Sequence, residues 1–347
     1  MIKTEKYQSA AGEISLLTLV NASGASVTLS TLGAGVVSVC VPDAEGRMAD
    51  VILGYEDPAD YLGDGPCAGK CPGRYANRIA RGHLEIDGHT YSLPINNGPN
   101  HLHGGPEGFQ NKIWRLVKAE GNEVVMEYVS PDGEMGYPGT LTARATYRWT
   151  DRNELQLTLE AETDAPTVVN LTNHSYWNLR GHDSGSALDH TLWLNASRWL
   201  PTDSTLVPTG EFAPVAGTPM DFTTAKTLGR DIKADFPALR YGKGYDNCFV
   251  IDGYEPGVLQ EAAVLADSVS GRQLTIYTDQ PAAQVYTGNW LTGSPLGKSG
   301  KVYEDYDAVA IECQDMPDAP NQPAFPSTRL NPGDHYERHI IYAFATL

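Results

Sequence analysis

The stretch LTARATYRWTDRNELQLTLEAET, residues 141–163, indicates the fold class more directly than any other segment. Apolar and polar residues alternate on both sides of Asp151-Arg152-Asn153, and a period of two places successive side chains on opposite faces of a β-strand. Asp and Asn favour turns because their side chains bond to nearby backbone. We therefore predict two antiparallel strands joined by a tight turn at residues 151–153.

The same alternation recurs along the chain, with turn residues between the segments. HLEIDGHTYSL (83–93) contains Asp87-Gly88, a pair that favours a type I′ hairpin turn. AVLADSVSGRQLTIYT (263–278) predicts another hairpin, which turns near Ser270-Gly271. Helical periodicity is confined to a turn or two near 223–232. Further strands are predicted at 14–20, 25–32, 36–41, 123–129, 166–172, 246–251, 283–288, 308–313 and 336–345.

Antiparallel strands without alternating helices bury their apolar faces by stacking sheets. We therefore expect an all-β protein, a large antiparallel β-sandwich. The 35 glycines and 23 prolines are spread along the chain, and no repeat, low-complexity tract or linker divides it. Residues 1–347 are expected to form a single domain.

The composition narrows the classes of function. With 43 acidic and 25 basic residues, the formal net charge is −18, which disfavours binding to nucleic acid. The first residues do not resemble a signal peptide, and no apolar run approaches the roughly 18–20 residues that span a bilayer. The five cysteines lack paired C-x-x-C spacing, which argues against a disulfide framework or zinc knuckle. We expect a cytoplasmic protein that binds no membrane.

Four stretches combine polar side chains with apolar neighbours: GRYANRIARG (73–82), PNHLHGG (99–105), VVNLTNHSYWNL (168–179) and AVAIECQDMPDAPNQ (308–322). Each has a structural interpretation. Arg78 can pair with a surface carboxylate, the paired histidines can close a glycine turn, and His174 can bond to amides in the core. Glu312 is harder to explain in this way, because it interrupts an apolar strand and buried glutamates are rare unless paired or functional.

A metal site is an alternative role for the histidines. HLHGGPE (101–107) and the spacing from His174 to Asn178 resemble the metal-ligand motifs of the cupins. However, Ile95 stands where the first motif has its leading glycine, the second motif lacks its proline and glycine, and the gap between the motifs is too long. These departures disfavour a metal centre at His101 and His103.

Taken together and in this order, GRYANRI, LHGG, NHSYWNL and ECQDMPDAPNQ resemble the aldose 1-epimerases, or galactose mutarotases. GYDNCF (244–249) and QVYTGN (284–289) add to the resemblance, which covers essentially the whole chain. It implies the galactose mutarotase-like supersandwich, a large antiparallel β-sandwich with an open, polar sugar cleft on one face.

The resemblance also implies roles for individual residues. Matched to the family motifs, Glu312 is the catalytic base and His174 the catalytic acid. His101 lies where the family is less demanding, so we expect its loss to have little effect. The residues implied to bind the sugar are Arg78, His103, Asp246, Asn77 and Gln284.

Mutarotation explains why these residue types are needed. One base accepts the proton of the C1 hydroxyl and one acid protonates the ring oxygen, without a metal or a covalent intermediate. We therefore expect no cofactor, free aldoses as partners, and a monomer or homodimer. Apolar neighbours should raise the pKa of Glu312. Carboxylates such as Asp246 should help to keep His174 protonated.

Two other classes of protein remain open. A glycosidase needs two opposed carboxylates, which Glu312 and Asp246 could supply. A carbohydrate-binding sandwich would keep aromatic residues such as Tyr176 and Trp177 for stacking. The joint presence of His174 and Glu312 favours the enzyme. The motifs do not distinguish galactose, glucose, xylose and arabinose as the preferred aldose.

Overall fold

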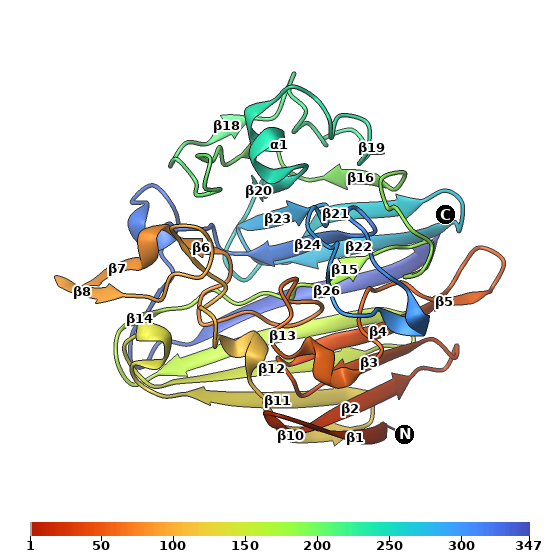
Figure 1. The fold of residues 1–347 in the computed structure, drawn as a ribbon, viewed down its shortest axis with the longest axis horizontal. Coiled ribbons are helices and arrows are strands. Elements are labelled where there is room, and N and C mark those ends of the chain that lie inside the picture. The colour runs from red at the N-terminus through yellow and green to blue at the C-terminus, as the bar shows by residue number, and fades with distance from the viewer. Residues whose placement is uncertain (1) are drawn as a thin grey trace.

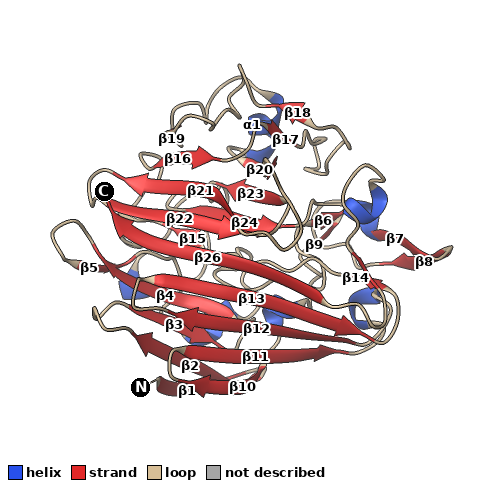
Figure 2. Cartoon of the chain, turned by 180° about the vertical axis from the view of Figure 1, so that it is seen from behind, coloured by secondary structure: helices blue, strands red, loops and turns tan. Residues whose placement is uncertain are grey.

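A nine-stranded antiparallel sheet extends across the molecule and is seen face on in Figure 2. The computed structural model describes residues 2–347. The long sheet runs in spatial order through β10 (Arg115–Glu120), β11 (Glu123–Ser130), β12 (Leu141–Trp149), β13 (Glu154–Thr163), β26 (Tyr336–Thr346), β22 (Arg272–Thr278), β21 (Gln260–Asp267), β16 (Thr191–Leu194) and β19 (Lys226–Thr227).

The three predicted hairpins are confirmed. β12 and β13 pair along their whole length, and the turn between them places Asn153 at φ 58°. The Asp87-Gly88 turn has φ values of 52° and 77°, the positive values that a type I′ turn requires. Gly271, at φ 69°, turns the chain from β21 into β22.

Two smaller sheets pack against the long one (Figure 1). The first, at the lower right of Figure 1, contains β1 (Lys3–Ser9), β2 (Gly12–Val20), β3 (Ser26–Ser30), β4 (Gly35–Pro42) and β5 (Met48–Asp50). The second has the spatial order β15 (Tyr176–Trp177), β24 (Val309–Gln314), β23 (Ala282–Tyr286), β20 (Asp246–Val250), β17 (Arg198–Trp199) and β18 (Ala213–Pro214).

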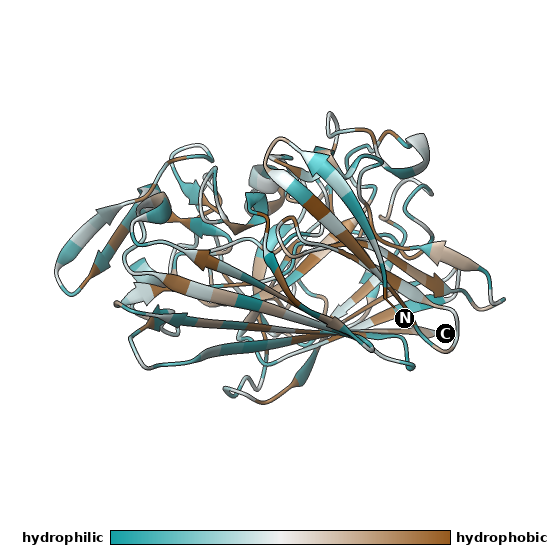
Figure 3. Ribbon diagram, turned by 90° about the horizontal axis from the view of Figure 1, so that it is seen from below, coloured by the Kyte–Doolittle hydropathy of each residue, from teal (hydrophilic) through white to brown (hydrophobic). Residues whose placement is uncertain are grey.

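One continuous apolar core joins the three sheets. Teal and brown segments alternate along the strands in Figure 3, as expected when one face is buried and the other solvated. Trp149 of β12 donates its indole N–H to the Ala25 carbonyl, 3.1 Å away, beside β3. Trp177 of β15 packs on Tyr342 and Phe344 of β26, with ring centroids 5.1 and 5.6 Å apart. The predicted sandwich is therefore correct.

Short elements connect and cover the sheets. Three two-stranded pairs are β14 (Thr167–Val168) with β25 (Arg329–Leu330), β6 (Arg78–Ile79) with β9 (His101–Leu102), and β7 (His83–Ile86) with β8 (His89–Ser92). The α-helix α1 is Pro237–Gly242, and 3₁₀ turns span Pro58–Tyr61, Ala80–Gly82, Phe109–Asn111, Glu134–Gly136, Lys298–Gly300 and Ala319–Asn321. Within residues 2–347, no helix has the length and hydropathy needed to cross a membrane.

Two sequence-based expectations about elements are wrong. Residues 223–232 form turns and the short strand β19 rather than a helix, and their apolar side chains Leu228 and Ile232 are buried from an irregular segment. Of the strand expected at 166–172, only β14 forms. The buried side chain of Asn170 instead bonds to the carbonyls of Ala76 and Asp315, which belong to other segments.

Candidate active site

A cleft of about 760 Å³ opens beside the six-stranded sheet. All but one of the residues predicted to bind or transform a sugar line this cleft: Asn77, Arg78, His103, His174, Asp246 and Glu312. The exception is Gln284, which lies behind Asp246 and donates from Nε2 to its Oδ1 at 2.6 Å. Residues far apart in the sequence are thus brought to one place.

Strand register explains how three of these side chains come to share a face. In neighbouring strands, Glu312 of β24 lies directly opposite Gln284 of β23, which lies opposite Cys248 of β20. Asp246 precedes Cys248 by two residues, so it points to the same side of the sheet. The intervening residues Ile311 and Cys313 point into the apolar core. The alternation that builds the sandwich therefore also exposes a polar row to the cleft.

His103 lies just after the short strand β9, and hydrogen bonds to the backbone of Asn77 position it. Its Nδ1 accepts the backbone N–H of Asn77 at 3.1 Å, and its own N–H donates to the Asn77 carbonyl at 3.1 Å. Both residues have positive φ, 52° and 64°. Only glycine fits at Gly104, because a Cβ there would lie 1.7 Å from the Gly73 carbonyl oxygen. Since Nδ1 accepts, the proton of the neutral imidazole resides on Nε2.

His174 and Glu312 form a buried pair on the cleft floor. His174 Nε2 lies 3.4 Å from Glu312 Oε1, and the two residues are 5% and 2% exposed. Burial, followed by the charge of Asp246, raises the pKa of Glu312 well above its ordinary value. The expected direction for Glu312 is confirmed.

Asp246 favours the protonated form of His174, as expected, but the net direction expected for the pKa of His174 is wrong. Burial lowers the pKa of His174 to about 4, and this outweighs the opposing effect of Asp246. At a pH between these two pKa values the pair holds a single proton, which resides on Glu312 while the imidazole is neutral.

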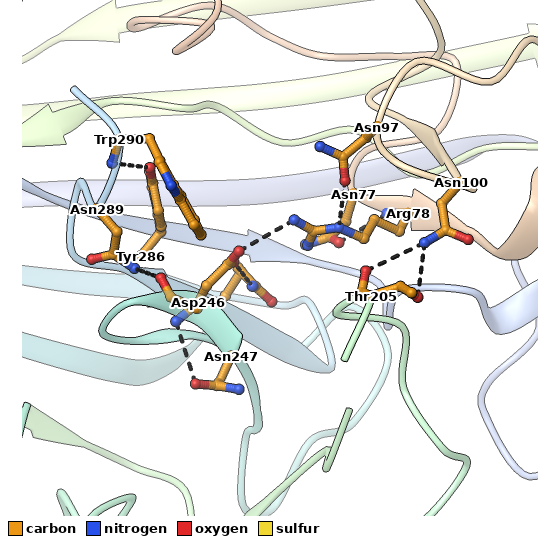
Figure 4. A network of polar contacts seen from close by, with 12 residues as sticks. Asn77, Arg78, Asn97, Asn100, Thr205, Asp246, Asn247, Tyr286, Asn289 and Trp290 are labelled. Atoms are coloured by element: carbon orange, nitrogen blue, oxygen red, sulfur yellow. Dashed lines mark hydrogen bonds and ion pairs between the residues drawn. The ribbon is translucent and has the colours of Figure 1, made fainter. Parts of the chain in front are cut away.

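A chain of polar contacts runs along one side of the cleft (Figure 4). Arg78 donates from Nη2 to Asp246 Oδ2 at 3.2 Å and from Nε to Asn97 Oδ1 at 3.2 Å. Asp246 in turn accepts from Gln284. Glu312 Oε2 and Gln284 Oε1 are buried, and neither has a hydrogen-bond partner within residues 2–347. The cleft thus contains a fixed guanidinium and a buried carboxyl group with one oxygen that lacks a partner, a combination that suits a ligand rich in hydroxyl groups.

His101 does not contribute to this site. Its Nδ1 donates to the Pro94 carbonyl at 2.7 Å, and its Nε2 accepts from the Tyr137 hydroxyl at 2.7 Å. Burial lowers its pKa to about 4. The His101–His103 metal pair suggested by the cupin motif therefore does not form. The imidazole of His101 instead joins two segments, because it bonds to both Pro94 and Tyr137.

A different trio could hold a metal ion by geometry. Ligand atoms of His103, His174 and Glu312 all lie within 4.8 Å of one another. Two imidazoles and a carboxylate are ligands that Zn²⁺ accepts. Two of these residues, His174 and Glu312, are the ones expected to handle protons, and His103 is expected to bind the sugar. Activity measured with a chelator distinguishes a metal site from a proton-transfer site.

Several residues of the cleft were missed or left undecided by the sequence analysis. Tyr286 and Trp290 stand side by side at the rim, with their rings stacked at an interplanar angle of 18° (Figure 4). Asn97 was also missed, although the amide-rich stretch NNGPN (96–100) contains it. Tyr176 lines the cleft, whereas its neighbour Trp177 is fully buried in the core. Only Tyr176 is therefore placed to touch a ligand.

Known proteins resemble this chain over most of its length. The family model described as aldose 1-epimerase matches residues 15–343. The human galactose mutarotase is 41% identical over 319 residues, 92% of this chain and 91% of that protein. The aldose 1-epimerase of Escherichia coli K12 is 38% identical over 331 residues, 95% of this chain and 94% of that protein.

Solved structures of aldose epimerases also resemble this fold. The structure of an aldose epimerase homologue from C. elegans superimposes with a TM-score of 0.88 at 33% identity, covering 96% of this chain and 99% of the other. The galactose 1-epimerase from Lactobacillus acidophilus NCFM gives a TM-score of 0.85 at 28% identity, covering 100% and 99%. The chain belongs to the aldose 1-epimerase family and is an enzyme of the carbohydrate isomerase class.

Proposed function

We propose that this enzyme interconverts the α and β anomers of free aldohexoses such as galactose and glucose, with Glu312 as base and His174 as acid. The observation that carries the proposal is the 3.4 Å separation of His174 Nε2 and Glu312 Oε1 on the cleft floor. The C1 hydroxyl oxygen and the ring oxygen share one carbon atom, so an acid and a base must lie close together to reach both. The names of the human and bacterial relatives support the same reaction.

The reaction proceeds in two half-reactions. In ring opening, Glu312 accepts the C1 hydroxyl proton, the bond between C1 and the ring oxygen breaks, and His174 protonates that oxygen. The open-chain aldehyde then rotates about the C1–C2 bond. In ring closure, the hydroxyl attacks the other face of the carbonyl, returns its proton to His174, and Glu312 protonates the new C1 oxygen. Each positioned acid or base accelerates such a step by about 10²–10⁴-fold.

A single proton shared by the pair serves both half-reactions. Ring opening needs Glu312 ionised and His174 protonated, whereas ring closure starts from the reverse distribution. The raised pKa of Glu312 and the pKa of about 4 for His174 favour the reverse distribution in the empty cleft. Proton transfer across the 3.4 Å contact interconverts the two states.

The remaining residues position the sugar. Arg78 and Asp246 hold each other at 3.2 Å and can bond to adjacent hydroxyls as a donor and an acceptor. His103 offers the Nε2 proton that its contact with Asn77 leaves free. Asn77 lies at the cleft wall. Gln284 acts through Asp246, because its amide fixes that carboxylate.

Polarimetry on freshly dissolved α-D-glucose and α-D-galactose tests the proposal. The protein should accelerate the change in optical rotation for at least one of these sugars, and the rate should be the same with and without EDTA. Equal concentrations of Glu312→Gln protein provide the matched control.

Two outcomes would overturn the proposal. Activity that disappears with chelator and returns with a divalent ion would assign His103, His174 and Glu312 to a metal instead. Release of p-nitrophenol from aryl glycosides without any effect on free sugars would indicate a glycosidase in which Glu312 and Asp246 act as paired carboxylates.

A further inference from the structure

A second group of histidines and carboxylates lies on the outward face of the nine-stranded sheet. Strand alternation places residues 160 and 162 of β13 and residues 337 and 339 of β26 on this face, while their neighbours Leu159 and Ile340 point into the core. We call this group the outer cluster, and its members are Glu160, Glu162, Asp279, His335, Glu337 and His339.

The centre of the outer cluster has the spacing of a metal site. His335 Nε2 lies 3.6 Å from Glu160 Oε1 and 3.2 Å from Glu337 Oε2, and all three atoms lie within 4.8 Å of one another. A tetrahedral zinc ion with bonds of about 2.0–2.2 Å holds its ligand atoms about 3.3–3.6 Å apart. We propose that Glu160, His335 and Glu337 bind one Zn²⁺ ion, with water as the fourth ligand.

The surrounding residues orient these ligands in the manner of an outer coordination shell. Metal-binding histidines usually direct their second nitrogen to a carboxylate, and His335 Nδ1 lies 3.5 Å from Glu162 Oε1. The other oxygen of Glu337, Oε1, lies 3.3 Å from His339 Nε2. The Nδ1 of His339 is in turn held by the buried carboxylate of Asp279 at 2.8 Å.

The outer cluster also contains carboxylates that no lysine or arginine of the described residues pairs with. Glu160 and Glu337 are direct partners across β13 and β26, an arrangement in which like charges are destabilising. Within residues 2–347, no lysine or arginine lies within 4.0 Å of the carboxylates of Glu160, Glu162 or Glu337. Arg144, which faces Glu160 in register, pairs with Glu127 instead. A bound divalent cation would remove this repulsion.

The ligand types select the class of metal. Imidazole suits zinc and its late first-row neighbours, whereas Ca²⁺ requires six to eight oxygen ligands. None of the outer-cluster residues lines the catalytic cleft. Zinc at this place therefore links β13 to β26 without contacting the sugar site.

Zinc titration of the full chain without a polyhistidine tag tests the inference, with calorimetry and polarimetry followed in parallel. We expect one Zn²⁺ per chain, a melting temperature raised by on the order of a few degrees at saturation, and an unchanged rate of mutarotation. His335→Gln and Glu337→Gln should abolish or weaken the binding at least tenfold. Glu162→Gln, which removes only an orienting contact, should weaken it about tenfold or more.

The control is His89→Asn, which changes an exposed histidine of β8 and should bind zinc like the parent. Circular dichroism establishes that each variant is folded. No zinc binding by the parent, or equal binding by the parent, His335→Gln and Glu337→Gln, would overturn the inference. If zinc inhibits mutarotation and still binds to the His335→Gln variant, the inference is overturned and the zinc site is the trio His103, His174 and Glu312 in the cleft.

Discussion

The pair that we propose as acid and base, His174 and Glu312, and the outer cluster contain the same residue types in opposite surroundings. His174 is 5% exposed beside Glu312, and burial lowers its pKa to about 4. The side chain of His339 is 35% exposed beside Asp279, and the hydrogen bond to that carboxylate raises its pKa. Burial therefore dominates in the cleft, and the carboxylate dominates at the surface.

This difference matters for chemistry. In the cleft, burial lowers the pKa of His174 and raises that of Glu312, and the mechanism we propose passes one proton between them. At the surface, His339 holds its proton tightly and fixes its neighbours in place. We therefore propose proton transfer for the buried pair of imidazole and carboxylate, and metal binding for the exposed one.

The largest effect is expected from Glu312→Gln. The amide preserves the shape of the side chain but cannot accept the C1 proton, so turnover should fall by about 10²–10⁴-fold while sugar affinity changes much less. Stopped polarimetry gives the turnover and calorimetry gives the affinity. Near-normal turnover would show that another group, with Asp246 the first candidate, is the base.

The two neighbouring histidines should behave differently. His103→Asn removes a donor from the cleft and should lower both sugar affinity and kcat/KM, by about 10-fold or more, the loss of one hydrogen bond to a polar ligand. His101→Asn should leave the activity of the folded protein nearly unchanged. It should lower the free energy of unfolding by about 1–3 kcal/mol, because the hydroxyl of buried Tyr137 loses its partner.

Polarimetry and urea unfolding on both variants separate these effects. Equal loss of catalytic activity in folded His101→Asn and His103→Asn would contradict the division into one structural and one sugar-binding histidine.

The smallest effect is expected in the outer cluster, from His339→Gln. Its raised pKa in the folded state means that His339 stabilises the fold below its unfolded pKa of about 6.5, and that this stabilisation is lost as the pH rises through the folded value. In EDTA, the variant should therefore melt below the parent at pH 6 and close to it at pH 9. Scanning calorimetry at both pH values measures the difference in melting temperature between the variant and the parent. A larger difference at pH 9 than at pH 6 would contradict the prediction.

The local features of the fold could be predicted from the sequence. The hairpin at Asp87-Gly88 and the pairing of β12 with β13 follow from alternation and turn chemistry, which are local properties. The prediction of helical turns at 223–232 was wrong. The apolar residues of this segment are buried from irregular backbone, so their spacing does not reflect a helical period. The edge strands β1 and β10 were not predicted. Their residues are almost all exposed, so they lack the alternation of buried and exposed side chains on which the prediction relied.

The family motifs identified most of the residues that the structure brings to the cleft. Glu312, His174 and Arg78 were found through the family motifs, and the structure brings all three to one cleft. Asn97 and Trp290 were missed, because only tertiary structure carries these loop residues to the cleft. The protonation of His174 was mispredicted because desolvation depends on the complete fold, which a list of neighbouring charges does not describe.

The pH dependence of kcat/KM for mutarotation tests the shared proton most directly. In the mechanism that we propose, the singly protonated pair is the active form, so activity should fall as the pH drops through about 4, where the pair takes up a second proton on His174. It should also fall at alkaline pH, above the raised pKa of Glu312, where the pair loses its only proton. Between these two pKa values the profile should be flat, after subtraction of the spontaneous rate. A tenfold fall per pH unit above about 6.5, the ordinary pKa of histidine, would contradict the account.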